Sequence, residues 1–242
     1  MGAGTGATRL AAEIAPMIDR LVIAVHIASR EPGQALIQRL GLAQVGFLIE
    51  LRLALPVRSV SHDGLRAMSR YVDPAELDAW LALQSAVGTL RISPDWLHLT
   101  DRSREFYAEL FPLHNRVATE AWSSRAGSLP TLAELTNQVL LAGADTGGDA
   151  VAATTPPYEP PGAGPALLLF NRLAALRYHR ADAHAAAWSA AGLTAATMQA
   201  LPAGARREEI EAETNRLAAP PYDALTGDER LALLTGLVAL PR

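Results

Sequence analysis

The chain has 242 residues, half of them hydrophobic and 19% charged, which is the composition of an ordinary globular protein. Its net charge of −4 gives no overall attraction to nucleic acid or to an anionic membrane surface. Cysteine is absent and all 21 basic residues are arginine, which excludes disulfides, thiolate chemistry and lysine Schiff bases.

The first 20 residues lack the basic start and apolar core of a signal peptide. Charged residues or prolines also interrupt every apolar segment within about 18 residues, which is too short for a membrane span. We therefore expect a cytoplasmic protein with no part in the membrane.

The first 55 residues predict two helices. Residues 8–29 carry apolar side chains at helical spacing, and Pro32-Gly33 should break that run. Residues 34–55 read as a helix that is apolar almost all round, with Glu50 and Arg52 as the only charges in its second half. Such a helix is normally buried in a bundle or in a dimer interface, so a homodimer is among the expected assemblies.

The next segment predicts an alternation of helices and a hairpin. Capping residues and a glycine mark a helix from Ser61 to Tyr71 and another from Asp73 to Val87. Two short strands follow, at Thr89–Ile92 and Trp96–Leu99. A long helix, capped by Thr100 and Asp101, then reaches about Ser123. This order is typical of a winged helix-turn-helix.

The rest of the chain predicts further helices around one long loop. Helices are expected over Thr131–Ala142, 166–191, 203–217 and after Asp228, and residues 143–165 are too rich in Gly and Pro for regular structure. We expect a mostly α fold with a winged helix-turn-helix core, a small β-hairpin wing and a C-terminal helical subdomain. Its parts should be a helical and winged-helix domain (1–142), a loop or lid (143–165) and the C-terminal subdomain (166–242).

Two stretches resemble known families. The segment WLHLTDRSREFYAELFPLH, from Trp96, resembles the wing-to-helix segment of MarR-like winged-helix regulators, although Ser103 stands where glycine is usual. The stretches LRYHRADAHAAAWSAAGL and IEAETNRLAAPPY are similar to an actinobacterial family of helix-turn-helix-like proteins. The two resemblances together cover residues 60–125 and 170–225. The first implies that the helix beginning at Asp73 enters the major groove of DNA.

The charges on that helix disfavour DNA. It carries Asp73, Glu76 and Asp78, and no arginine lies between Arg70 and Arg91. Carboxylates repel phosphates, so binding would depend on arginines of neighbouring elements. Those arginines are Arg58, Arg66, Arg70, Arg91 and Arg102.

The stretch RYHRADAHAAAW, from Arg177, is the densest group of candidate site residues. On a helix, Arg177, Arg180, His184 and Trp188 fall on one face with Phe170 and Leu173, so they interrupt an apolar stripe. A buried guanidinium needs an anion, which leaves two interpretations. Either these arginines pair with Glu208, Glu211 or Glu213, or at least one of the face's polar residues binds a ligand. Off the stripe, Asp182 should accept a bond from another element, and His179 should be a surface residue.

The remaining candidates lie in the predicted winged-helix domain. His98 shares a face of the wing strand with Trp96, and His114 lies mid-helix eight residues before Trp122. A structural role is the more common one for any single histidine of this kind. The chain has neither an HExxH metal pattern nor a nucleophile-elbow serine, so we expect no metal.

These observations predict a pocket between the wing-side helix and the C-terminal helices, covered by the 143–165 loop. It should hold a small aromatic or acidic metabolite without a cofactor. The catalytic candidates are His184 and His114, and the ligand-binding candidates are Arg177, Arg180, Trp188, Tyr178, His98 and Trp122.

Two functions follow. The first is a winged-helix-derived small-molecule-binding protein that no longer reads DNA and acts as a cofactor-independent acid–base enzyme of bacterial specialised metabolism. The alternative is a MarR-like dimeric transcriptional regulator that binds DNA and responds to a small ligand.

Overall fold

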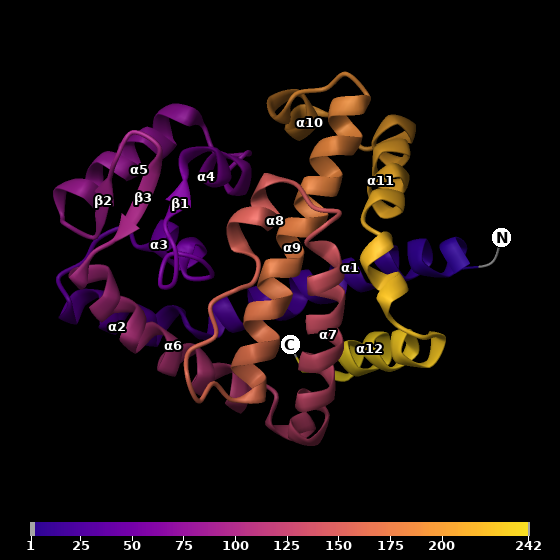
Figure 1. Ribbon diagram of the computed structural model, residues 1–242, viewed down its shortest axis with the longest axis horizontal. Coiled ribbons are helices and arrows are strands. Elements are labelled where there is room, and N and C mark those ends of the chain that lie inside the picture. The colour runs from indigo at the N-terminus through magenta and orange to yellow at the C-terminus, as the bar shows by residue number, and fades with distance from the viewer. Residues whose placement is uncertain (1–2, 242) are drawn as a thin grey trace.

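The computed structural model describes residues 3–241 and is mostly helical, with one small antiparallel sheet (Figure 1). The first half of the chain forms α1 (Ala3–Ala28), α2 (Arg30–Arg39), α3 (Gly46–Leu51), β1 (Val60–Ser61), α4 (His62–Met68), α5 (Pro74–Ala86), β2 (Leu90–Ile92), β3 (Trp96–Leu99) and α6 (Asp101–Ala121). The second half forms η1 (Ser123–Ser128), α7 (Leu129–Gly143), α8 (Asp149–Thr154), α9 (Pro165–Ala190), α10 (Ala195–Ala200), α11 (Ala205–Leu217), η2 (Pro220–Ala224) and α12 (Gly227–Ala239).

The elements fall into two groups that lie side by side in Figure 1. One group contains α2 to α5 and the sheet, and the other contains α7, α9, α11 and α12. Helix α1 crosses behind α7 and α9 and packs against α9, α11, α12 and η2. A single cluster of buried hydrophobic side chains, from Ala7 in α1 to Leu240 after α12, runs through both groups.

The sheet has the strand order β1-β3-β2, and both pairings are antiparallel. Its inner face carries apolar side chains that are at most 2% exposed: Val60, Leu90 and Leu97. The predicted hairpin of β2 and β3 is confirmed, whereas the two-residue strand β1 was not predicted.

The side chains that were predicted to cap helices do cap them. The side chain of Ser61 accepts from Gly64 N at 3.0 Å, and that of Asp73 accepts from Ala75 N at 2.8 Å. Thr100 and Ser103 form a capping box at the start of α6. Ser103 is fully buried there, and its hydroxyl oxygen accepts from Thr100 N at 3.0 Å.

The predicted helix over residues 34–55 is wrong. Helix α2 ends at Arg39 and α3 begins at Gly46, because Gly41 (φ 60°) and Gln44 (φ 50°) adopt left-handed conformations between them. Pro32 does not break a helix either, since it lies in the first turn of α2, where its missing N–H needs no partner. Residues 46–55 are largely buried inside this chain, which removes the reason for expecting them in a dimer interface.

The expectation that residues 143–165 lack regular structure is also wrong in part. Helix α8 forms within them, and it begins because the side chain of Asp182 accepts from Gly148 N and Val151 N, each at 2.9 Å. The cap comes from α9, far along the chain, so the local sequence does not reveal it. Helix α10 was also missed, although Thr194 and Thr197 form a capping box at its start.

Candidate functional site

Four predicted residues line one hollow, which we call the central cavity. Its volume is ≈ 570 Å³, and it lies between α1, α3, α4, α9, α11 and η2. The predicted residues that line it are Arg177, Tyr178, Arg180 and His184. Its apolar wall comes from one face of α1, with Ala11, Ala15, Ile18 and Val22.

The side chains of Arg177, Arg180 and His184 lie half-buried at the rim of the central cavity, so the prediction that they lie in a buried stripe is wrong. The Arg177 side chain is 38% exposed, and its Nε lies 2.7 Å from Asp19 Oδ1 on α1. Arg180 pairs with Glu211, one of the expected glutamates. The other two glutamates offered as partners lie elsewhere: Glu213 pairs with Arg216 on its own helix, and Glu208 is exposed.

The buried face of α9 changes along the helix, which explains that error and a second one. Beyond Leu176 the packed face is the one with His179, Ala183 and Ala187, at the i, i+4 and i+8 positions. His179 was predicted at the surface, but it is only 2% exposed and its Nε2 lies 2.9 Å from Thr146 Oγ1. Burial lowers the pKa of His179, so it is neutral at pH 7 and belongs to the packing.

His184 and Trp188 occupy different surroundings. His184 Nδ1 lies 3.0 Å from Thr214 Oγ1, whose hydroxyl donates to Ile210 O. The Thr214 oxygen therefore accepts from His184, which places the proton on Nδ1 and leaves Nε2 as an acceptor. Burial lowers the pKa of His184. Trp188 is not among the lining residues of the central cavity, and its Nε1 donates to the hydroxyl of Tyr71 at 3.1 Å.

Three other candidates lie away from the central cavity. His98 lies on the sheet, where its ring nitrogens lie 2.7 Å from Ser59 Oγ and 3.0 Å from Ser93 Oγ. Trp122 and His114 are each 1% exposed and belong to the core. The structure thus brings together four of the five predicted residues of α9, without Trp188, and it leaves out the candidates in β3 and at α6.

Arg52 is a site residue that the sequence reasoning did not select. It follows the C-terminus of α3, lines the central cavity and is 1% exposed. Its Nη1 donates to Ile49 O at 2.8 Å, and its guanidinium lies 4.8 Å from the centre of the Phe170 ring. Its Nε and Nη2 have no hydrogen-bond partner among residues 3–241. Burial lowers the pKa of Arg52, although a guanidinium keeps its charge at any physiological pH.

The charge of Glu50 acts electrostatically on Arg52, but the carboxylate is hydrogen-bonded to another residue. The hydroxyl of Tyr178 donates to Glu50 Oε2 at 2.6 Å. Burial and the Glu50 charge together raise the pKa of Tyr178, so Tyr178 is a neutral donor at pH 7. No ion pair between Glu50 and Arg52 occurs in the described part of the chain.

His26 is a second residue that was not selected, and it lies beside His114. The two rings are 5.8 Å apart, and each is 5.2 Å from the Phe170 ring. Burial and the positive charge of Arg52 lower the pKa of His26 to about 4. The same causes lower the pKa of His114, whose Nδ1 is buried without a partner in the described residues. Both histidines are therefore neutral at pH 7.

A second cavity, of ≈ 360 Å³, lies between α6 and the segment after α8. Its walls include Tyr107 and Phe111 from α6 and Tyr158 and Pro160 from that segment. It lies under part of the 143–165 loop, where a pocket was expected, but none of the predicted site residues lines it.

Within residues 3–241, no group of three His, Asp or Glu side chains is arranged to hold a metal ion. No helix over those residues is both long and apolar enough to cross a membrane. Comparison of the chain with protein-family models, curated proteins and solved structures gives no match. Function is therefore inferred from the chemistry of the site itself.

Proposed function

We propose that the protein binds a small organic molecule in the central cavity. The observation that carries this proposal is the make-up of the cavity: an apolar wall on α1 faces polar groups from α3 and α9 across ≈ 570 Å³. Natural small-molecule sites have this composition, a mostly apolar surface with a few polar groups that fix orientation. The volume lies within the range of such sites, about 300–1,000 Å³.

Filling the cavity tests this proposal. Ala15 is a buried residue of the α1 wall, and Ala15→Phe would add a ring to the space that the ligand needs. The melting temperature of the protein is measured with each member of a set of small aromatic molecules. Half of the set are carboxylates and half are the corresponding neutral amides. We expect members of the set to stabilise the natural protein but not Ala15→Phe. The control is Ala28→Phe, which adds the same ring at an exposed position of the same helix.

If no member of the set stabilises the natural protein, or if Ala15→Phe binds as well as the natural protein, the proposal is wrong. The melting temperatures without ligand show whether either variant is damaged by the added ring.

The geometry supports binding better than acid–base catalysis. His114 is in the core and does not line the central cavity, so it cannot reach a ligand there directly. His184 does line it and keeps a free acceptor at Nε2. An enzyme would therefore depend on His184, and His184→Gln would abolish turnover of a bound compound while leaving its affinity within a few-fold.

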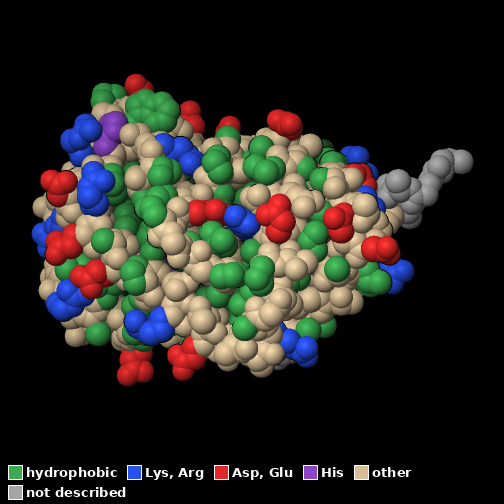
Figure 2. All heavy atoms as spheres, turned by 60° about the horizontal axis from the view of Figure 1, so that its bottom comes forward, with side chains coloured by type: hydrophobic (Ala, Val, Ile, Leu, Met, Phe, Trp, Pro, Cys, Tyr) green, Lys and Arg blue, Asp and Glu red, His purple; other side chains and the backbone are tan. Residues whose placement is uncertain are grey.

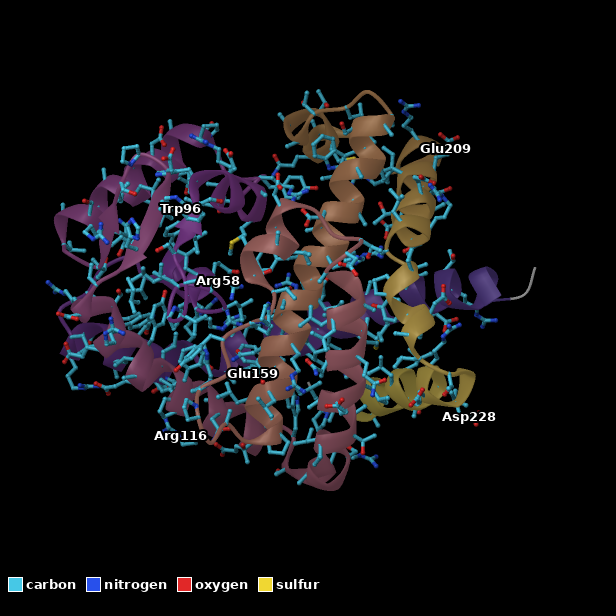
Figure 3. All side chains as sticks on the ribbon, viewed as in Figure 1. Arg58, Trp96, Arg116, Glu159, Glu209 and Asp228 are labelled. Atoms are coloured by element: carbon cyan, nitrogen blue, oxygen red, sulfur yellow. The ribbon has the colours of Figure 1, made fainter. Side chains whose placement is uncertain are left out.

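A DNA-binding regulator is the second candidate, because the order β1, α4, α5, β2, β3 and α6 matches a winged helix-turn-helix of the MarR-like kind. In that reading α5 is the recognition helix and β2–β3 is the wing. The side chain of Trp96 in this wing, labelled in Figure 3, is exposed. The central cavity borders α3 and α4, so a ligand there would contact the winged-helix part directly.

The arginines that should bind phosphates weigh against this second candidate. Arg58 faces α8 (Figure 3) and donates to Ala153 O and Pro156 O. Arg70 pairs with Asp182, and Arg102 donates to Val87 O. Basic and acidic side chains are interspersed over the face drawn in Figure 2. These arginines would have to leave their present partners before they could bind phosphates and displace the counterions of the DNA.

A mobility-shift assay at low salt separates the two candidates. The probe is the DNA upstream of the protein's own gene, with an unrelated sequence of equal length as the control. A small-molecule-binding protein without a DNA function gives no sequence-dependent shift. A shift that is specific and that a small molecule reverses would favour the regulator.

A further inference from the structure

Among the described residues, Arg52 is the one buried arginine whose Nε and Nη2 groups have no hydrogen-bond acceptor. Arginine presents Nε–H and one Nη2–H side by side on one edge of the guanidinium, and both lack a partner here. Leaving a buried charge unpaired costs several kcal/mol in general. The chain keeps that charge at a cavity wall, where a bound molecule could supply the acceptors.

Arg172 shows what this edge binds when the chain supplies the partner. It is also buried, and its Nε and Nη2 lie 2.6 Å and 3.0 Å from the two carboxylate oxygens of Glu159, which Figure 3 labels. Arg216 uses the same edge for Glu213. A carboxylate matches this edge because its two oxygens have the spacing of the two N–H groups.

The other two arginines around the central cavity are already paired with carboxylates. Arg177 has Asp19 and Arg180 has Glu211, both across the cavity rim. His26 lines the same cavity and is neutral at pH 7. The Glu50 carboxylate also lines the cavity and acts on the Arg52 charge, so an anion of one charge is repelled less there than a phosphate dianion.

We infer that the central cavity binds small organic acids and that the Nε–Nη2 edge of Arg52 holds their carboxylate. This inference rests on the proposed function and adds the chemical class of the ligand and the residue that selects it. The apolar part of the acid lies against the α1 wall of Ala15, Ile18 and Val22. The Phe170 ring, which packs against the guanidinium, holds Arg52 in place for this contact.

The test compares 1-naphthoate with 1-naphthamide by isothermal titration of the full chain at pH 7. The two probes share one apolar body and differ in the charged group. We expect the natural protein to bind naphthoate at least tenfold more tightly than naphthamide. Arg52→Met should remove that preference and leave naphthamide binding within threefold. Arg9→Gln, which removes an equal charge from an exposed position on α1, should keep the preference.

The outcomes separate this inference from the proposed function. Equal affinity of the natural protein for the two probes overturns the role of Arg52 but leaves small-molecule binding intact. Absence of binding by both probes overturns the two together. A preference that survives in Arg52→Met assigns the carboxylate to another residue and also overturns the inference. The comparison within the natural protein needs no variant, so it decides the matter even if Arg52→Met folds poorly.

Discussion

Two buried charged residues of this chain differ in how their hydrogen bonds are satisfied. Asp182 accepts from two backbone N–H groups at the start of α8 and from Arg70 in the turn after α4, so its charge is fully engaged in joining elements. The Nη1 group of Arg52 donates to the carbonyl of Ile49. Its Nε and Nη2 groups have no acceptor among the described residues. The first pattern is that of a structural residue, and the second leaves two donors for the carboxylate that we propose as a ligand.

Arg52→Met should therefore raise the free energy of unfolding of the ligand-free protein. Methionine has a similar volume and leaves no charge in the core, and such replacements are stabilising by about 1–4 kcal/mol where the charge was poorly paired. Urea denaturation at pH 7 measures the change. A structural role for Arg52 predicts the opposite, a loss of about 3–5 kcal/mol.

The pKa of His26 makes a second prediction, on stability in acid. Its pKa is about 4 in the folded protein and 6.5 in an unfolded chain, so between these pH values the unfolded chain binds a proton that the folded one does not. The free energy of unfolding should fall as the pH falls from about 6.5 to about 4, by at most about 3 kcal/mol from this group.

His26→Gln removes this titration and should make the pH dependence less steep over that interval. Urea denaturation at pH 7, 5.5 and 4.5 measures it for both proteins. His114, whose pKa shifts in the same direction, leaves part of the slope in the variant. Parallel curves for the natural protein and the variant would contradict the assignment to His26.

Only some of the residues at the central cavity could be predicted from the sequence. The dense run from Arg177 to His184 stood out because charged residues interrupted an apolar pattern, and the structure places its four predicted site residues at one cavity. Arg52 carried the same signal, one cation in the apolar run FLIELRLALPV, and reasoning about buried guanidinium groups applied to it equally. His26 carried no such signal, because its position depends on how α1 packs against α9.

At the scale of elements, local capping signals predicted well and long-range contacts did not. The helices from His62, Pro74 and Asp101 begin after the side chains that were expected to cap them. Helix α8 depends on Asp182, which lies 31 residues after Val151 in the chain. The break before α3 depends on two residues in left-handed conformations, one of which is not a glycine.

The close approach of α4 and α8 gives a prediction at this scale. A Cβ on Gly64 would lie 2.9 Å from the Cβ of Ala153, so Gly64→Ala forces the two helices apart. We expect a loss of about 1–3 kcal/mol in the free energy of unfolding. Gly33→Ala in α2 is the control, since no atom lies within 4 Å of its new Cβ, and it should be neutral or stabilising by about 0.5–1 kcal/mol. Equal effects of the two changes would mean that the helices do not meet at Gly64.

At the scale of the whole molecule, the N-terminal helix connects distant parts of the chain. Arg20 of α1 donates to the carbonyls of Leu237 and Leu240 at the end of α12, at 2.8 Å and 3.1 Å. The main hydrophobic cluster includes buried residues on both sides of the 143–165 segment. The division into the parts 1–142, 143–165 and 166–242 stays a prediction, and this packing argues that they unfold together.

We accordingly expect one cooperative unfolding transition. The four tryptophans include Trp80 in α5, Trp96 in β3 and Trp188 in α9, so fluorescence reports on both groups of elements. Urea curves followed by fluorescence and by far-ultraviolet circular dichroism should coincide. Two separate transitions would show that the groups are independent domains.

The most direct measurement of the central claim is the NMR signal of the Arg52 Nε–H group during titration with 1-naphthoate. Arg52 is buried, so its Nε–H exchanges slowly with water, and the signal is assigned by its absence from Arg52→Met. A carboxylate on the Nε–Nη2 edge predicts a downfield shift of this signal that saturates with the calorimetric binding curve. Saturation of binding with an unmoved Arg52 signal, while those of Arg177 or Arg180 shift, would contradict the claim.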